Sequence, residues 1–154
     1  HQFVWHEALD GWNLFSIGFN TICHDNPDGF IRGEADYFKT VPYDLLSKDY
    51  VMHGVQVSTQ YGEAISGYEN FPQKPFDNWK SIDLKKVKIT AEDVLRIAEA
   101  NGGKEARLSV QNKCYIELGL TGDSSHWEML VYKENSDSLI FNVQIDPYTG
   151  RIIK

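Results

Sequence analysis

Ile89-Thr90-Ala91-Glu92-Asp93-Val94 opens the stretch that decides the fold, which continues to Gly103 and ends in Asp146-Pro147-Tyr148-Thr149-Gly150-Arg151-Ile152-Ile153. Thr90 is suited to cap a helix, and Asp93 stands three residues later, as in a shortened capping box. Apolar residues then recur at helical spacing until Asn101-Gly102-Gly103, which can adopt the left-handed conformation that ends a helix. The pattern predicts a helix over residues 90–103.

Strand-like runs separated by turn-forming residues follow this helix. We expect strands at Arg107–Gln111, Cys114–Leu120, His126–Lys133 and Leu139–Asp146. Pro147 and Gly150 favour a turn after the last of them, so residues 151–153 can fold back as a short strand. The second half of the chain is therefore predicted to be a helix lying across an antiparallel meander.

The first half repeats this order with different residues. Trp5, Ala8, Leu9 and Trp12 have helical spacing, and strand-like runs follow at Asn13–Ile22, Phe30–Phe38 and Val51–Tyr61. The turn sequence Asn26–Gly29 joins the first two strands, and residues 71–83, with two prolines, are typical of a connector. We expect an aromatic-rich α+β domain over residues 1–80 and a second domain over residues 81–154.

Composition limits the classes of partner. The 154 residues carry a net charge of −7, and residues 1–80 hold 5 Lys/Arg against 11 Asp/Glu. Such an acidic half repels phosphates, so neither nucleic acid nor an anionic lipid surface is an expected partner. No apolar run reaches the roughly 18 residues that a membrane-spanning helix needs. The chain starts at His1, which fits either a mature product that has lost a signal peptide or membrane anchor, or a trimmed start.

Two cysteines, Cys23 and Cys114, stand in different halves of the chain. Their spacing matches no metal motif and no redox pair. They form either a long-range disulfide or two buried thiols.

The second half resembles the PepSY domain. Besides the helix, the resemblance rests on Trp127–Tyr132, Phe141–Asp146 and the turn and strand Pro147–Ile153, and it covers residues 84–154. It implies a cystatin-like α+β fold, with an antiparallel sheet packed on a helix, either as two units in tandem or as one fused version of them. It also implies a secreted or envelope-associated protein that binds or restrains proteases or assists envelope proteins. The family has no catalytic motif to carry over.

Motifs for catalysis, metals and cofactors are weak in this sequence. The five histidines lack the spacing of a zinc helix, and Asp25–Gly29 fits a turn better than a calcium loop. The serines lack a nucleophile elbow, and Gly102-Gly103 ends a helix instead of opening one. We therefore expect no enzyme activity, metal or cofactor.

Aromatic residues are concentrated in the first half, with 15 of the 20 in residues 1–80. Most must fill a core, but a group around the connector is the sequence's candidate ligand-binding site: Tyr61, Tyr68, Phe71, Phe76 and Trp79. The competing interpretation is that these rings pack the two halves together.

The sequence as a whole predicts a non-enzymatic, extracytoplasmic binding or regulatory module of the cell envelope. Its partner would be a protein or peptide, added at an edge strand, and inhibition of a protease is one role that such binding could have. The main alternative is a small-molecule carrier or small enzyme with a cavity between helix and sheet. A third interpretation is a structural spacer beside a membrane anchor.

Overall fold

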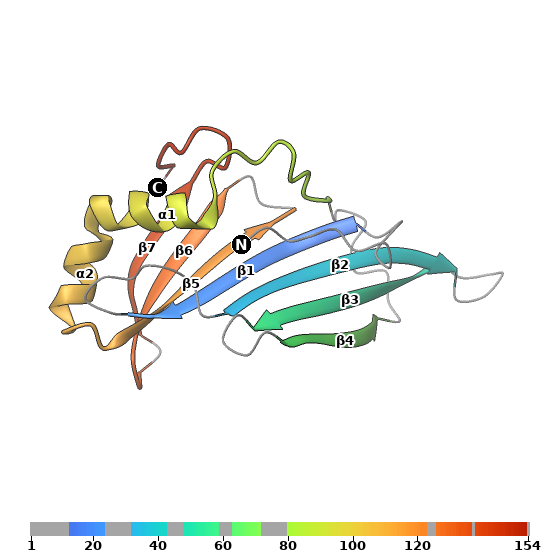
Figure 1. Ribbon diagram of the computed structural model, residues 1–154, viewed down its shortest axis with the longest axis horizontal. Helices are drawn as coiled ribbons and strands as arrows, with labels where there is room; N and C mark the ends of the chain where they lie inside the picture. Colours follow the sequence, from blue (N-terminus) through green and yellow to red (C-terminus); the bar gives the residue numbers. More distant parts are fainter. Residues whose placement is uncertain are drawn as a thin grey trace.

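In the computed structural model of this chain, the described residues form one sheet of seven antiparallel strands, and helix α1, Ala91–Ala98, lies on one of its faces (Figure 1). The structure describes residues 13–23, 32–42, 48–58, 63–71, 80–122, 126–136 and 138–153, without the side chains of 32, 38–42, 48–58 and 63–71. The strand order is β4-β3-β2-β1-β5-β6-β7. The strands are β1 Asn13–Ile22, β2 Arg32–Pro42, β3 Lys48–Ser58, β4 Glu63–Phe71, β5 Cys114–Thr121, β6 Trp127–Lys133 and β7 Leu139–Ile145.

Strand β1 joins the two halves of the chain, because it pairs with β2 on one side and with β5 on the other. Ile17 lies opposite Ala35 of β2 and Leu120 of β5. The predicted α+β class, an antiparallel sheet on a helix, is confirmed, and the two halves share one sheet, as in the fused arrangement. The division into domains at residue 80 stays a prediction.

The strands of the first half depart from the prediction beyond β1. β2 runs to Pro42, β3 begins earlier and ends at Ser58, and Glu63–Phe71 forms a further strand that was not predicted. Glu63, Gly67 and Asn70 have poor strand propensity, so pairing with β3 outweighs local preference in β4. The predicted helix at residues 5–12 and the turn Asn26–Gly29 lie outside the described residues.

Helix α1 spans Ala91–Ala98, and its N-terminal cap is confirmed. The Thr90 hydroxyl accepts a hydrogen bond from the Asp93 amide at 3.2 Å, and the Asp93 carboxylate accepts one from the Thr90 amide at 3.1 Å. The Thr90 backbone amide is the main cause that holds the pKa of Asp93 below its usual value, with further help from the Thr90 hydroxyl and the Arg96 guanidinium. The cap therefore satisfies amides that a helix start otherwise leaves without partners.

Replacing Thr90 with alanine should lower the free energy of unfolding by about 1 kcal/mol, because the Asp93 amide loses its acceptor. Thr90→Asp should be nearly neutral, since a carboxylate can accept the same bond at a helix N-terminus. The Asp93 carboxylate contributes its full stabilisation of the fold above the pKa that it has in the unfolded chain. This stabilisation is lost as the pH falls through the lower pKa of Asp93 in the folded protein. Urea midpoints of both variants measure the effect. Equal losses would show that the helix does not depend on this cap.

The predicted helix end is partly wrong. α1 stops at Ala98, an irregular turn covers Glu99–Gly103, and the chain then resumes as α2, Lys104–Ser109. Gly102 has a φ of 108°, as expected of a helix-ending glycine, and the chain changes direction there. The predicted strand Arg107–Gln111 is also wrong. Lys, Glu, Ala, Arg and Leu in succession are good helix formers, and this preference prevailed over the short apolar run.

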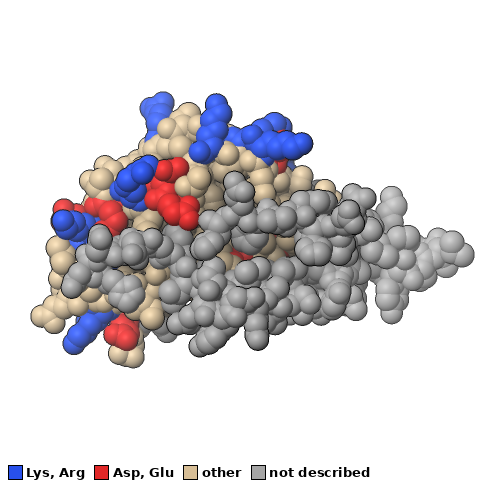
Figure 2. All heavy atoms as spheres, viewed as in Figure 1, with Lys and Arg blue, Asp and Glu red and all other residues tan. Residues whose placement is uncertain are grey.

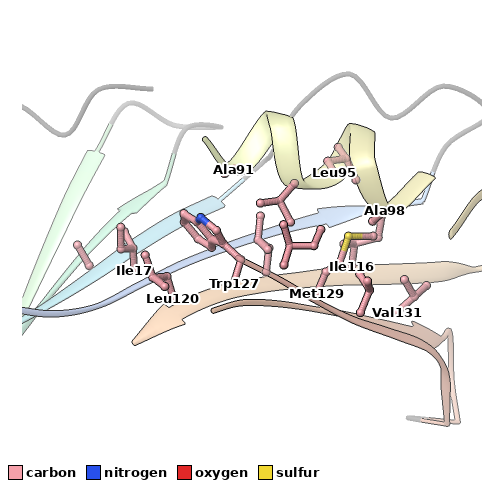
Figure 3. Close-up of a cluster of buried hydrophobic side chains, with 14 of the residues drawn as sticks. Ile17, Ala91, Leu95, Ala98, Ile116, Leu120, Trp127, Met129 and Val131 are labelled. Atoms are coloured by element: carbon pink, nitrogen blue, oxygen red, sulfur yellow. The ribbon is translucent and has the colours of Figure 1, made fainter. Parts of the chain in front are cut away.

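The core lies on the helix side of the sheet, and its buried side chains come from α1 and from β1, β2, β5, β6 and β7 (Figure 3). Leu95 and Ala98 of α1 face Met129 and Val131 of β6, and all four are at most 5% exposed. Trp127 is 2% exposed, and its indole N–H donates to the Ile89 carbonyl at 3.0 Å. The ring thereby fills the space under the helix start without leaving its polar atom unpaired.

The turn after β7 is tied to the start of α1. The Pro147 carbonyl accepts hydrogen bonds from the Lys88 and Ile89 amides at 2.9 and 3.0 Å. A Cβ on Gly150, which has a φ of 73°, would lie 3.2 Å from a methyl group of Ile89, so glycine is needed for both shape and space. Beyond the turn, Ile152 forms a bridge to Ile145, which confirms the predicted return strand as a single bridged residue.

A disulfide joins Cys23, just after β1, to Cys114, the first residue of β5. The two Cα atoms are 5.2 Å apart, and the Cys23 amide donates to the Cys114 carbonyl at 2.9 Å. Of the two arrangements that the sequence leaves open, the structure has the bridge. It fastens the first half to the second at the end of the β1–β5 ladder.

Candidate functional site

The aromatic site predicted from the sequence is only partly within the described chain. The backbones of Tyr68 and Phe71 lie on β4, an edge strand of the sheet, opposite His53 and Tyr50 of β3. Tyr61, Phe76 and Trp79 lie outside the described residues, as do the side chains of Tyr68 and Phe71. A ligand site at these five aromatics therefore stays a prediction.

The space between α1 and the sheet is filled by apolar side chains. Val94, Met129 and Ile145 have no exposed surface, and Trp127 has its N–H paired. Tyr37, on β2, is buried as well, and burial raises the pKa of its phenol, so it stays protonated at neutral pH. In the described part of the chain, the layer between α1 and β6 thus offers no group for acid–base chemistry.

The opposite face of the sheet carries the polar side chains. Gly18 of β1 lies between Glu34 of β2 and Gly119 of β5, and Gly119 lies opposite Glu128 of β6. Glu128 lies in turn opposite Gln144 of β7, whose amide N–H donates to it at 3.5 Å. Because side chains alternate along each strand, this row faces away from the buried Ile17, Leu118 and Met129. Two glycines therefore stand side by side between two glutamates.

A hollow of about 370 Å³ opens over these glycines. Its lining includes the carboxylate residues Glu34, Glu117 and Glu128, together with His126 at its rim. Three carboxylates around one hollow make it a region of negative potential, which favours a cationic group in the ligand. The described residues contain no cluster of histidine, cysteine and carboxylate groups suited to hold a metal ion.

Two tyrosines stack on the same face of the sheet, and one of them, Tyr115, is two residues before Glu117 on β5. Tyr115 of β5 and Tyr132 of β6 are cross-strand partners with ring centroids 5.1 Å apart. Both are partly exposed, and Ile22 of β1, opposite Tyr115, is 53% exposed. The face thus combines a negatively charged hollow with a neighbouring apolar patch.

Sequence reasoning missed this face, although a signal for it exists. Gly18 and Gly119 interrupt runs that otherwise read as buried strands, Ser16–Phe19 and Ile116–Leu120. A glycine in a strand interior weakens the strand and often marks a place where a ligand or another backbone comes close. The sequence shows each glycine separately, but only the register of β1 on β5 shows that they are neighbours.

Comparison with known proteins identifies the second half of the chain. Residues 88–154 carry a PepSY domain, the family described as "Peptidase propeptide and YPEB domain", which confirms the resemblance predicted for residues 84–154. Among solved structures, a protein of Clostridium difficile 630 described as a "putative lipoprotein" matches with a TM-score of 0.55 and 10% sequence identity. The match covers 96% of this chain and 84% of that one, so the fold is shared over nearly the whole length. No curated protein matches the sequence.

Proposed function

We propose that this protein is a non-enzymatic module outside the cytoplasm that binds an extended segment of a protein or peptide across the open face of its sheet. Three findings support the location: the PepSY domain, the fold shared with a protein described as a lipoprotein, and the disulfide, which belongs to oxidising compartments. In the described chain, no helix is long and apolar enough to cross a membrane. The family's description names peptidase propeptides, which makes a peptidase the first partner to test.

The observation that carries the proposal is that two glycines, Gly18 and Gly119, form the floor of the hollow. Neither Gly18 nor Gly119 has a positive φ, and a Cβ on either would meet no described atom closer than 3.9 Å. The backbone geometry therefore does not require glycine at these positions. Glycine in a strand costs roughly 0.5 to 1 kcal/mol relative to alanine, so keeping two of them side by side leaves a space at the expense of stability.

The chemistry of the hollow indicates which segment would fit. Glu117 and Glu128 stand on neighbouring strands beside the floor, so a lysine or arginine side chain pointing down between them would be paired at its charged end. The Tyr115–Tyr132 stack would contact an aromatic or aliphatic neighbour two positions further along the same segment. An extended polypeptide with alternating side chains meets both requirements, and it requires no catalytic group.

The alternative of a small enzyme or carrier is less well supported. It needs a cavity between helix and sheet with titratable groups, and the described residues there are closely packed and apolar. The hollow that the structure contains lies on the other face.

Gly119→Val should abolish binding at the hollow while leaving the fold intact. The added side chain projects into the floor, where a Cβ has room, and a β-branched residue favours a strand. The measurement is an NMR titration of the labelled protein with an extended peptide in which every second residue is threonine and the residues between are lysine and phenylalanine in turn, so that an aromatic side chain stands two positions from each lysine. The expected result is shifts at Gly18 and Gly119 amides in the wild type, and none in the variant.

Two controls make this result specific. Ser138→Val places the same side chain on the exposed turn before β7 and should leave the titration unchanged. A peptide with glutamate in place of lysine should not bind. The proposal fails if the Gly119→Val variant melts like the wild type and still binds the lysine peptide, or if shifts appear only around β4.

A further inference from the structure

A second surface lies on the helix side of the sheet, on the face opposite the hollow. The segment 80–90 leads from β1, where the Ile82 amide donates to the Leu14 carbonyl, to the start of α1, where it meets the turn after β7 (Figure 1). The Lys88 and Ile89 amides both donate to the Pro147 carbonyl, which holds the two segments together. Both segments lie along the upper edge of the molecule in Figure 1.

This surface is basic although the chain is acidic. Segments 80–90 and 146–153 contain five Lys/Arg and two Asp, against a net charge of −7 for the whole chain. Lys85, Lys86, Lys88 and Arg151 are all exposed. Figure 2 shows the Lys and Arg side chains along the upper edge of the molecule, over the segment before α1 and the turn after β7. Asp83 pairs with Lys86 at 3.2 Å, and Asp146 is occupied by the Tyr148 and Thr149 amides.

Exposed apolar side chains accompany these cations. Leu84 is 43% exposed and stands directly before Lys85, while Ile152 and Ile153, 43% and 53% exposed, directly follow Arg151. Tyr148, on the turn between the segments, is 49% exposed. These residues make up most of the large hydrophobic side chains that are exposed in the described chain, and they gather where the cations are.

We propose that this basic and apolar surface docks the protein on a membrane that contains anionic phospholipids. Lipid headgroups would neutralise the four cations, and the aliphatic and tyrosine side chains would enter the boundary between headgroups and acyl chains. An acidic protein partner would also match the charges. A lipid surface is favoured because apolar side chains stand directly beside the cations along the chain, as a shallow apolar layer beneath charged headgroups requires. The net charge of −7 by itself predicts repulsion from anionic lipid. In the folded structure, however, the basic residues lie apart from the carboxylates of the open face.

Vesicle sedimentation with the full chain tests the proposal. The protein should bind phosphatidylcholine vesicles that contain phosphatidylglycerol, and not phosphatidylcholine alone. Each surface cation contributes about a fivefold change in affinity, so Lys85→Gln with Lys88→Gln should weaken binding roughly 25-fold. Lys104→Gln with Lys113→Gln removes the same charge from exposed residues elsewhere and should have little effect.

The apolar residues separate a membrane from other polyanions. Leu84→Ser with Ile153→Ser should weaken vesicle binding several-fold and leave binding to soluble polyglutamate unchanged. All these positions are exposed, so melting temperatures should stay at the wild-type value. The proposal is overturned if the protein does not sediment with the anionic vesicles, if both lysine pairs weaken binding equally, or if the serine variant binds vesicles as well as the wild type does.

Discussion

Replacing Arg107 with methionine is expected to lower the free energy of unfolding by about 3 to 5 kcal/mol, the range measured when one partner of a buried ion pair is removed. Arg107 is 2% exposed, and its guanidinium donates to both carboxylate oxygens of Glu99 and to the Asn112 side chain. Methionine fills a similar volume but donates no hydrogen bond. The Glu99 carboxylate, 19% exposed, would then keep its charge with little solvent to stabilise it. Urea unfolding of the variant, with its midpoint and slope, measures the loss.

Two further variants separate this explanation from a simple loss of packing. Arg107→Met combined with Glu99→Gln should recover part of the lost stability, because the uncompensated charge is removed. Arg96→Met is the matched control: Arg96 pairs with Asp93 on the exposed side of α1, its side chain is 77% exposed, and the expected change is at most about 1 kcal/mol. If Arg107→Met costs no more than Arg96→Met, the pair does not hold α2 against the end of α1.

The ion pair between Arg107 and Glu99 also explains why the sequence pattern gave a wrong prediction for residues 107–111. Locally, Arg107–Gln111 reads as a short strand between turn residues, and Asn101-Gly102-Gly103 as the end of the helix that Thr90 caps. The structure keeps the left-handed glycine but places a second helix after it, with Arg107 reaching back eight residues to Glu99. A contact of this kind depends on the direction of the chain after the turn, which a pattern of apolar residues does not contain.

Predictions that rest on adjacent residues succeeded better. The Thr90 cap, the three predicted strands from Cys114 onward and the turn at Asp146–Gly150 follow from hydrogen bonds and φ preferences within a few residues. The open-face site depends instead on register. Gly18 and Gly119 are 101 positions apart in the sequence and become neighbours only because β1 pairs with β5. The sequence left open whether the two halves form separate units or one fused unit, so it did not predict this pairing. Strand β4 was missed for a related reason. Its residues have low strand propensity, and it is the pairing with β3 that holds them in an extended conformation.

Reduction of the disulfide is expected to lower stability by about 4 to 5 kcal/mol on the chain-entropy model, because the bridge closes a long loop in the unfolded chain. Cys23 and Cys114 are 91 positions apart and are 4% and 3% exposed. Since reductant reaches the buried bridge poorly in the folded protein, the chain should be reduced in denaturant and refolded under reducing conditions. Comparing urea midpoints of the oxidised and reduced wild type keeps the packing of both sulfur atoms, which Cys23→Ala with Cys114→Ala would remove.

A thiol count gives this prediction its independent check. Alkylation in denaturant without reductant should label no cysteine, and intact mass should rise only after reduction. Two labelled thiols in protein taken from its natural compartment would show that the bridge is absent there, and the argument for an oxidising location would fall with it. The size of the stability loss on reduction also tests whether the two halves of the chain fold together. The bridge lies where the β1–β5 ladder ends, so it restrains the strand pairing that joins the acidic first half to the PepSY domain. A loss near the full entropic value would mean that this pairing forms only in the folded state, and that the two halves fold as one cooperative sheet.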